Sequence, residues 1–298
     1  MSDWEIIPSF AKINLGLNIL KKRKDGYHSI ESIFQTISLH DNLYLKLEGD
    51  IIEVSSPSDD VPNGKLNLVY KAAKMFGEHT GKNIGLNVRI EKNIPVESGL
   101  GGGSSNAASI LLTLNRFFGY PLTTDELIII ASKLGSDVPF FIQGGTAYAT
   151  GRGEQLEWKE DIPELYIILI LPSFGISTEW AYKMWDKSGD KTLTNKKLII
   201  ILNQLINGNL EAIKDLRNSF TNLIIKEYPK IRLILGKLRE YNPMNIIVSG
   251  SGPTLCAIFG SESKRDIVRE ILVRDYRTIS TRTISRKEYF NSLKLKED

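Results

Sequence analysis

The chain has 298 residues, of which 42% are hydrophobic and 24% are charged. This balance is typical of a soluble globular protein and excludes a disordered chain. Basic residues number 38 and acidic residues 35, so the formal net charge is only +3. Such a small, scattered excess argues against a nucleic-acid or membrane partner.

The single cysteine, Cys256, excludes an intramolecular disulfide, and its apolar surroundings predict a buried thiol. The first five residues have no basic stretch followed by an apolar run, so no signal peptide is expected. The longest apolar runs, such as 165–171, are far shorter than the ~20 residues of a membrane span. We therefore predict a cytoplasmic protein.

The first half of the chain alternates between strand and helix patterns. Strict alternation predicts a strand over 13–19 with one buried face, and Lys12 and Asn14 lie on its other face. Thr123 and Glu126 form a capping box, which predicts the start of a helix that ends at Gly135. The remaining expectations are strands over 43–47 and 84–90, helices over about 66–79 and from Ser104 to Gly119, and a hairpin made of 140–142 and 146–150.

The second half begins after Gly153, where the pattern changes. We place a domain boundary near residue 155, which divides the chain into an N-terminal domain, 1–155, and a C-terminal domain, 156–298. The overall fold class is α+β. The expected elements are a buried strand at 165–171, several helices between about 178 and 241, strands at 246–248, 255–259 and 277–284, and a helix at about 263–274.

A glycine-rich segment precedes the helix that starts near Ser104. Its four glycines free backbone amides to converge on an anion, and the helix N-terminus adds about half a positive charge. Two serines at the helix start can donate hydroxyls to phosphate or hold a metal. We therefore predict a nucleotide-phosphate loop made of Pro95, Val96, Glu97, Ser98, Gly99, Leu100, Gly101, Gly102, Gly103, Ser104 and Ser105.

Other phosphate loops do not match this segment. The chain has no G-x-x-x-x-G-K-[ST], which excludes a Walker-type P-loop. A dinucleotide fingerprint would need glycine at position 104, where Ser104 stands, and a later acidic residue where Gly119-Tyr120-Pro121 stands. A flexible turn that happens to precede a helix is the remaining alternative.

Three blocks of sequence carry a family resemblance. Gly99-Leu-Gly-Gly-Gly-Ser-Ser-Asn-Ala-Ala108 resembles the second motif of the galactokinase, homoserine, mevalonate and phosphomevalonate (GHMP) kinase superfamily, and Ser249-Gly-Ser-Gly-Pro-Thr254 is similar to its third motif. Pro8-Ser-Phe-Ala-Lys-Ile-Asn-Leu15, followed by Asp25-Gly-Tyr-His28, resembles the start of 4-diphosphocytidyl-2-C-methyl-D-erythritol kinases. The blocks occur in the expected order and cover nearly the whole chain.

The resemblance implies a two-domain GHMP-kinase-like fold with ATP and substrate in the interdomain cleft. It implies ATP-dependent phosphorylation, with Mg²⁺, of the 2-hydroxyl of the cytidyl-diphosphate methylerythritol substrate in the non-mevalonate route to isoprenoid precursors. Two alternatives stay open, namely another GHMP kinase acting on homoserine, mevalonate or a sugar, and a catalytically silent nucleotide-binding regulator. The metal ligands and the oligomeric state are left open.

Two residues match the family's catalytic pair. Asp137 would accept the proton of the substrate hydroxyl, although from sequence alone it could equally be a turn or cap residue. Lys12 would keep the aspartate ionised or neutralise charge in the transition state, although it could also be an ordinary solvated strand lysine.

Other matches point to binding roles. By the resemblance, Asn14 would orient substrate or Lys12, and Thr178 would lie near the substrate phosphates or polyol. Tyr27 and His28 would hold the cytosine, and Tyr182 would form a second aromatic wall. Asn67 resembles an adenine-side residue and is also a good helix N-cap. The turn 250–254 is expected to approach the glycine loop, or simply to join two strands.

Two positions depart from the family pattern. Glu97 places a negative charge in the phosphate loop, where it is expected to face solvent. Asn106 stands where many family members have Asp.

Overall fold

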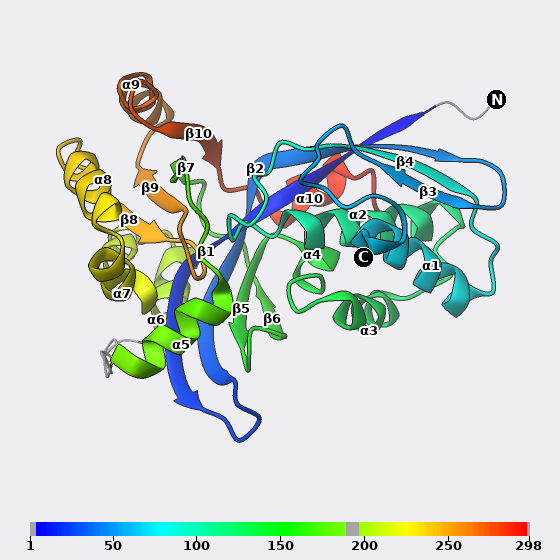
Figure 1. Ribbon diagram of the computed structural model, residues 1–298, viewed down its shortest axis with the longest axis horizontal. Helices are drawn as coiled ribbons and strands as arrows, with labels where there is room; N and C mark the ends of the chain where they lie inside the picture. Colours follow the sequence, from blue (N-terminus) through cyan, green and yellow to red (C-terminus); the bar gives the residue numbers. More distant parts are fainter. Residues whose placement is uncertain (1–3, 189–196, 297–298) are drawn as a thin grey trace.

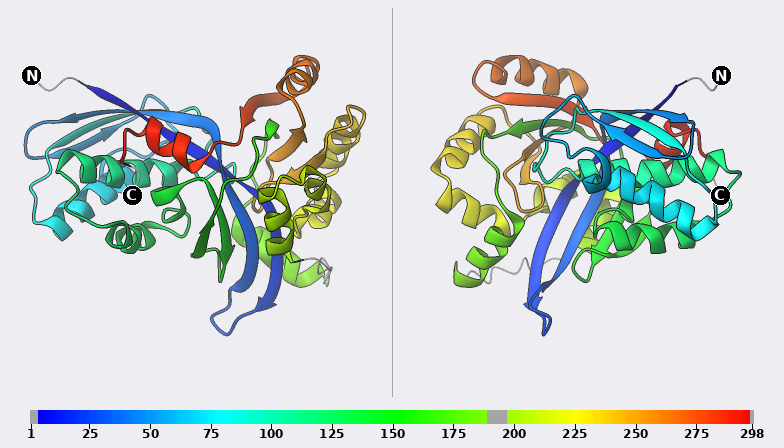
Figure 2. Two further views of the ribbon diagram at one scale, coloured as in Figure 1. Left: turned by 180° about the vertical axis from the view of Figure 1, so that it is seen from behind. Right: turned by 45° about the vertical axis from the view of Figure 1, so that its right-hand side comes forward.

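The computed structural model describes residues 4–188 and 197–296, and it consists of two β-sheets with helices packed on them (Figure 1). Two long antiparallel strands, β1 (Glu5–Lys22) and β2 (His28–Leu47), run through the middle of the molecule and connect its two helical groups (Figures 1 and 2). Their register joins Glu5 to Leu45 at one end and Lys22 to His28 at the other.

The first sheet has six strands in the order β3-β4-β2-β5-β6, with β1 paired to β2. Its partners are β3 (Ile52–Ser55), β4 (Leu86–Glu91), β5 (Thr146–Thr150) and β6 (Gln155–Lys159). Helices pack on this sheet and share its apolar core, which includes Phe76, Leu111 and Phe141. They are α1 (Leu68–Thr80), α2 (Gly102–Phe117), α3 (Thr124–Leu134), α4 (Phe140–Gln143) and α10 (Arg286–Ser292), with the short 3₁₀ helix η1 (Gly64–Leu66) ahead of α1.

The second sheet has four antiparallel strands in the order β10-β7-β9-β8. They are β7 (Tyr166–Leu171), β8 (Asn245–Val248), β9 (Leu255–Phe259) and β10 (Arg277–Arg282). Around them lie α5 (Thr178–Ser188), α6 (Leu198–Ile206), η2 (Leu210–Asp215), α7 (Phe220–Glu227), α8 (Pro229–Arg239) and α9 (Glu262–Leu272). The prediction of several helices here is confirmed, and residues 189–196 lie outside the described part of the chain.

A central apolar cluster joins the two sheets. It combines Ile13 and Leu15 of β1 with Ile167 and Leu169 of β7 and Leu202 of α6, all fully buried. The predicted burial of Cys256 in this cluster is confirmed, and burial raises the pKa of its thiol to about 12. The thiol is therefore protonated and unreactive at neutral pH.

The polar face of β1 is not solvated, which corrects the expectation of one buried face. Lys12, Asn14 and Asn18 are 4%, 2% and 4% exposed. One face of β1 packs toward α2, while α6 and β8 approach from the second half of the chain. The buried polar residues of β1 must therefore find partners inside the protein.

One predicted hairpin is wrong. Residues 140–142 begin α4, and β5 pairs with β2 and β6 instead. Phe140, Phe141 and Ile142 are all buried, and three apolar residues in a row do not distinguish a buried helical turn from a strand. The sequence analysis also missed β3, β6 and α10, whereas the capping box of Thr123 and Glu126 at α3 is confirmed.

The division near residue 155 remains a prediction. β6 belongs to the first sheet, and α10 returns from the end of the chain to place Tyr289 in the first sheet's core. Within residues 4–188 and 197–296, we find no helix with the length and apolarity to span a membrane.

Candidate active site

The glycine segment forms a tight loop that leads directly into α2. Gly99 and Gly101 have φ values of 76° and 74°, and Gly101 is the N-cap of the helix. A Cβ at Gly101 would lie 2.9 Å from the Phe141 ring and 3.2 Å from Cγ of Lys12. Only glycine therefore satisfies both the left-handed conformation and the close packing, and the predicted loop-to-helix junction is confirmed.

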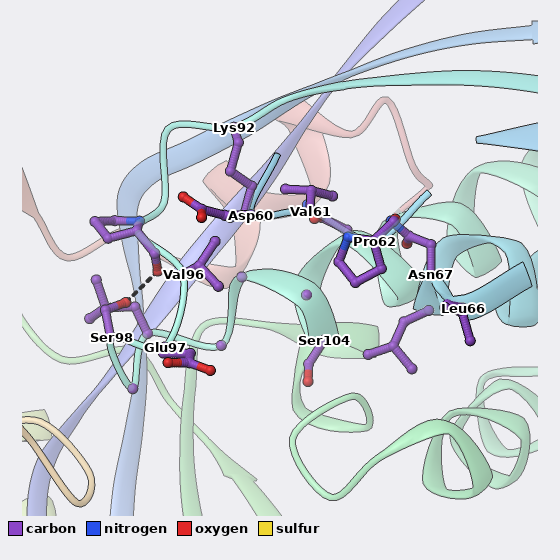
Figure 3. A pocket seen from close by; sticks show the side chains of 18 residues that line it. Asp60, Val61, Pro62, Leu66, Asn67, Lys92, Val96, Glu97, Ser98 and Ser104 are labelled. Atoms are coloured by element: carbon purple, nitrogen blue, oxygen red, sulfur yellow. Dashed lines mark hydrogen bonds between the residues drawn. The ribbon is translucent and has the colours of Figure 1, made fainter. Parts of the chain in front are cut away.

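A cavity of about 350 Å³ opens over this loop (Figure 3). Its opposite wall comes from residues 60–62 and from the start of α1. Leu66 and Val96 border the cavity and are 76% and 44% exposed, so two apolar side chains are available to a ligand. The cavity thus combines the backbone amides of a helix N-terminus with an apolar edge, which suits a nucleotide.

Asn67 holds the cavity wall together. Its side-chain oxygen accepts a hydrogen bond from the Val69 amide at 2.9 Å, and its Nδ2 donates to the Pro62 carbonyl at 2.6 Å. The predicted N-cap is therefore confirmed. Because Asn67 also lines the cavity, its position is compatible with a contact to a bound base.

Lys12 and Asp137 face each other at the base of the glycine loop. Nζ of Lys12 lies 3.5 Å from Oδ2 of Asp137, and the two side chains are 5% and 37% exposed. Nζ also donates to Oδ1 of Asn14 at 2.8 Å and lies 4.4 Å from the centre of the Phe34 ring. The backbone amide of Lys12 donates to the Leu100 carbonyl, which fixes β1 to the loop.

The orientation of Asn14 follows from its other partners. The Ser32 hydroxyl donates to the Gly16 carbonyl at 2.7 Å, so its oxygen must accept the bond from Nδ2 of Asn14 at 2.8 Å. The amide oxygen of Asn14 is then turned toward Lys12. Ser32 thus acts through Asn14 to hold the ammonium group in place.

The turn that contains the third motif packs against the glycine loop. The Thr254 hydroxyl donates to the Ser98 carbonyl at 2.8 Å, and the backbone amide of Asn14 donates to Oγ of Ser249 at 3.3 Å. The expected approach of this turn to the loop is confirmed. Thr178, at the start of α5, lies with its hydroxyl oxygen 3.0 Å from that of Ser251, so this predicted substrate contact lies beside the turn.

Of the three residues predicted to hold a base, His28 and Tyr182 pack against each other, whereas Tyr27 is exposed. The rings of His28 and Tyr182 are stacked with centroids 5.3 Å apart, and Tyr182 meets the Phe220 ring edge-on. Burial, with a smaller contribution from the Asp137 charge, raises the pKa of Tyr182 to about 12. Tyr27 is 58% exposed and lies under the Arg152 guanidinium.

The chain is similar to known proteins over most of its length. The family described as GHMP kinases N terminal domain matches residues 67–145, and that described as GHMP kinases C terminal matches residues 201–278. A 4-diphosphocytidyl-2-C-methyl-D-erythritol kinase of Persephonella marina is 38% identical over 93% of this chain and 98% of its own length. Another, from Caldicellulosiruptor saccharolyticus, is 37% identical over 86% of this chain and 89% of its own length.

The chain belongs to the 4-diphosphocytidyl-2-C-methyl-D-erythritol kinase family. It is therefore a kinase with the GHMP fold. A crystal structure of a 4-(cytidine 5'-diphospho)-2C-methyl-D-erythritol kinase superposes with a TM-score of 0.81 and 28% identity, covering 94% of this chain and 99% of that one. The mevalonate kinase of Methanococcus jannaschii, at 15% identity and a TM-score of 0.73 over 95% and 99% of the two chains, shares the fold.

The sequence analysis of this kinase missed a buried polar group beneath the loop. Asp41 is fully buried, and its carboxylate accepts from Nζ of Lys92 at 2.7 Å and from Nδ2 of Asn106 at 2.9 Å. Two backbone amides, those of Asn93 and Ile94, complete its bonding at 2.8 Å each. No local pattern marks these residues, because the group forms only when three separate segments meet.

The same group explains one departure from the family pattern. Asn106 donates to Asp41 and to Oγ of Ser9, which an aspartate at this position could not do while ionised. Lys92 reaches the cavity, where its Nζ would be 2.7 Å from a Cβ on Gly102. Burial lowers the pKa of Lys92, and the nearby Asp41 opposes that change.

Proposed function

We propose that this kinase transfers the γ-phosphoryl group of ATP to the 2-hydroxyl of 4-diphosphocytidyl-2-C-methyl-D-erythritol. The family relationship over nearly the whole chain supports this reaction. The observation that carries it is the Lys12–Asp137 pair at the base of the glycine loop, 3.5 Å apart. Phosphoryl transfer requires chiefly that the reactants are positioned and their charge is neutralised, and this pair can contribute to both.

Asp137 is the proposed general base. Its carboxylate is 37% exposed, so a substrate hydroxyl can reach it and transfer its proton to it. Lys12 is nearly buried and already oriented by Asn14. Its charge would stabilise the negative charge that develops on the transferred group, at little cost in reorganisation.

The nucleotide is proposed to occupy the cavity over the loop. The phosphates would lie against the amides of residues 95–105, at the N-terminus of α2. The base would lie against the exposed apolar edge, with Asn67 on the adenine side and Leu66 and Val96 nearby. Glu97 borders the same cavity and is exposed, in agreement with the expectation that it faces solvent.

The second substrate is proposed to bind on the other side of the Lys12–Asp137 pair. Asn14 and Thr178 would contact its polyol or phosphates, and Tyr27, His28 and Tyr182 would hold its cytosine. The Asp137 charge contributes to the raised pKa of Tyr182, which supports this placement. It indicates that the Tyr182 phenol lies close to the proposed general base, Asp137. Tyr27 would have to turn from Arg152 to stack on the cytosine.

Mg²⁺ is proposed to accompany ATP. Ser105, an attractive ligand by sequence, is fully buried with its oxygen 2.8 Å from that of Ser9, so it does not fit that role. Within the described ranges, no three His, Cys, Asp or Glu side chains gather as a metal site. The ion would rely mainly on the nucleotide phosphates and water.

A direct assay tests the reaction. Incubation with MgATP and the cytidyl-diphosphate substrate should yield a singly phosphorylated product, and cytidine monophosphate should compete with the substrate. Absence of product would refute the proposal. Transfer to homoserine, mevalonate or a sugar without inhibition by cytidine monophosphate would identify a different GHMP kinase, and ATP binding without any transfer would identify a regulator.

A further inference from the structure

A second polar cluster lies where β1 ends and β2 begins. Nε2 of His28 is 2.7 Å from Oδ1 of Asp186, a residue of α5. The ammonium group of Lys22 binds the other oxygen of the same carboxylate. His28 is 7% exposed, and one face of its ring is covered by Tyr182. The cluster therefore holds an imidazole in a fixed position from two sides.

The direction of the His28–Asp186 bond follows from charge. The bond from Lys22, together with that from His28, holds the pKa of Asp186 below its usual range, so this carboxylate is ionised near neutral pH. An ionised carboxylate can only accept, so Nε2 of His28 must carry the proton.

The other ring nitrogen of His28, Nδ1, differs from Nε2 in its hydrogen bonding. Nδ1 of His28 makes no hydrogen bond to any residue in the described ranges, 4–188 and 197–296. In a neutral ring protonated on Nε2, Nδ1 is a pure acceptor. Tyr27 precedes His28 in the chain and Tyr182 stacks on its ring, so Nδ1 belongs to the group of residues that is proposed to hold the base.

We propose that Asp186 is a positioning residue that holds His28 as the neutral Nε2–H tautomer and leaves Nδ1 to accept a bond from an exocyclic amino group of the substrate's base. This inference rests on the proposed function and deepens it. Cytosine carries an amino donor at the position where uracil carries a carbonyl acceptor. An acceptor at Nδ1 therefore attracts the amino group of cytosine and repels the carbonyl group of uracil. Asp186 would then determine specificity without touching the substrate.

The tautomer can be observed without any assay of activity. The chain has three histidines. Nδ1 of His40 and Nδ1 of His79 face backbone carbonyls, at 2.8 and 2.9 Å, and must donate to them. We expect ¹⁵N imidazole spectra to show the Nδ1–H form for these two and the Nε2–H form for His28, assigned with His28→Gln. Asp186→Ala should convert His28 to a mixture of forms, and an Nδ1–H signal for His28 in the unmodified enzyme would overturn the proposal.

Competition between nucleotides tests the consequence. We expect cytidine monophosphate to inhibit more strongly than uridine monophosphate, and Asp186→Ala to reduce this ratio about tenfold, as loss of one oriented hydrogen bond would. Lys22→Met removes the ion pair between the strand and α5 but keeps the His28 contact, so it should retain the ratio. The KM for ATP should be unaffected in both variants.

The outcomes separate the two proposals. If Asp186→Ala left the preference for cytidine monophosphate over uridine monophosphate unchanged, or if Lys22→Met reduced that preference equally, the role of Asp186 would be overturned. Phosphorylation of the cytidyl substrate by the unmodified enzyme would still support the proposed function. If neither nucleotide inhibited the unmodified enzyme and the cytidyl substrate were not phosphorylated, the proposed function would fall together with the role of Asp186.

Discussion

The Lys12 ammonium and the Asp137 carboxylate lie 3.5 Å apart, yet the first is 5% exposed and the second 37%. Lys12 comes from the middle of β1, whereas Asp137 comes from the loop between α3 and α4. The cation is therefore fixed inside the protein while the anion is open to a substrate. This asymmetry suits a base that must be reached and a charge that must be held in place.

Asp137→Asn removes the base but keeps the size of the side chain. We expect kcat to fall by about 10²–10⁴-fold, the usual contribution of general base catalysis, with ATP affinity close to that of the unmodified enzyme. Steady-state kinetics and calorimetric titration with ATP measure the two effects separately. Near-normal turnover in this variant would remove Asp137 from the role of base.

Lys12→Met removes the buried charge and keeps an unbranched side chain. We expect kcat to fall by at least about 10²-fold, because the transition state loses a preorganised cation. Lys21→Met is the matched control, since Lys21 lies on the same strand and is exposed. Steady-state assays of both variants, with thermal melts to verify folding, should show the loss only in Lys12→Met; an equal loss in the control would contradict the assignment.

Gly101→Ala tests the geometry of the phosphate loop. Gly101 and Gly208 have φ values of 74° and 81°, but an added Cβ would clash with Phe141 at 2.9 Å in the first and meet no atom within 4 Å in the second. We expect Gly208→Ala to lower the free energy of unfolding by about 1–2 kcal/mol, the cost of the left-handed conformation. Gly101→Ala should lower the free energy of unfolding by more than Gly208→Ala does, and it should also weaken ATP binding.

Urea denaturation and ATP titration of the two glycine variants provide the comparison. Equal losses of stability, with ATP affinity unchanged in both, would show that the contact with Phe141 and Lys12 does not shape the loop.

Tyr182 should report the nearby charge. Its pKa is raised from 10.0 to about 12, first by burial and then by Asp137. The folded state thus holds this proton more tightly than the unfolded state, so its contribution to stability is complete below pH 10 and is lost as the pH rises to about 12. Tyr182→Phe should remove this part of the alkaline loss in denaturant titrations.

The coupling between Tyr182 and Asp137 has its own measurement. The difference in tyrosinate absorbance between the unmodified enzyme and Tyr182→Phe isolates this one phenol. In the Asp137→Asn background the same difference should titrate at lower pH, although still above the ordinary value because burial remains. An identical midpoint in both backgrounds would place Asp137 too far away to act on the aromatic residues.

Features that depend on neighbouring residues were predictable from sequence. The glycines at 99 and 101, the start of α2 and the capping box of α3 are encoded by backbone conformation and by hydrogen bonds between residues three or four positions apart. The ordered motifs around Lys12, His28, Gly101 and Ser249 also indicated the family. The hydrogen bond between Lys12 and Asn14 agrees with their predicted position on the same face of β1.

Features that depend on distant segments were decided by the tertiary structure. Alternation in β1 marks an apolar face, but it cannot tell what covers the polar one, so the burial of Lys12 and Asn14 was unforeseen. The bonds from Lys92 to Asp41 and from His28 to Asp186 likewise join residues with no local signal. Their cause is physical: a polar group buried by packing must find a partner, and only the assembled fold determines which partner is within reach.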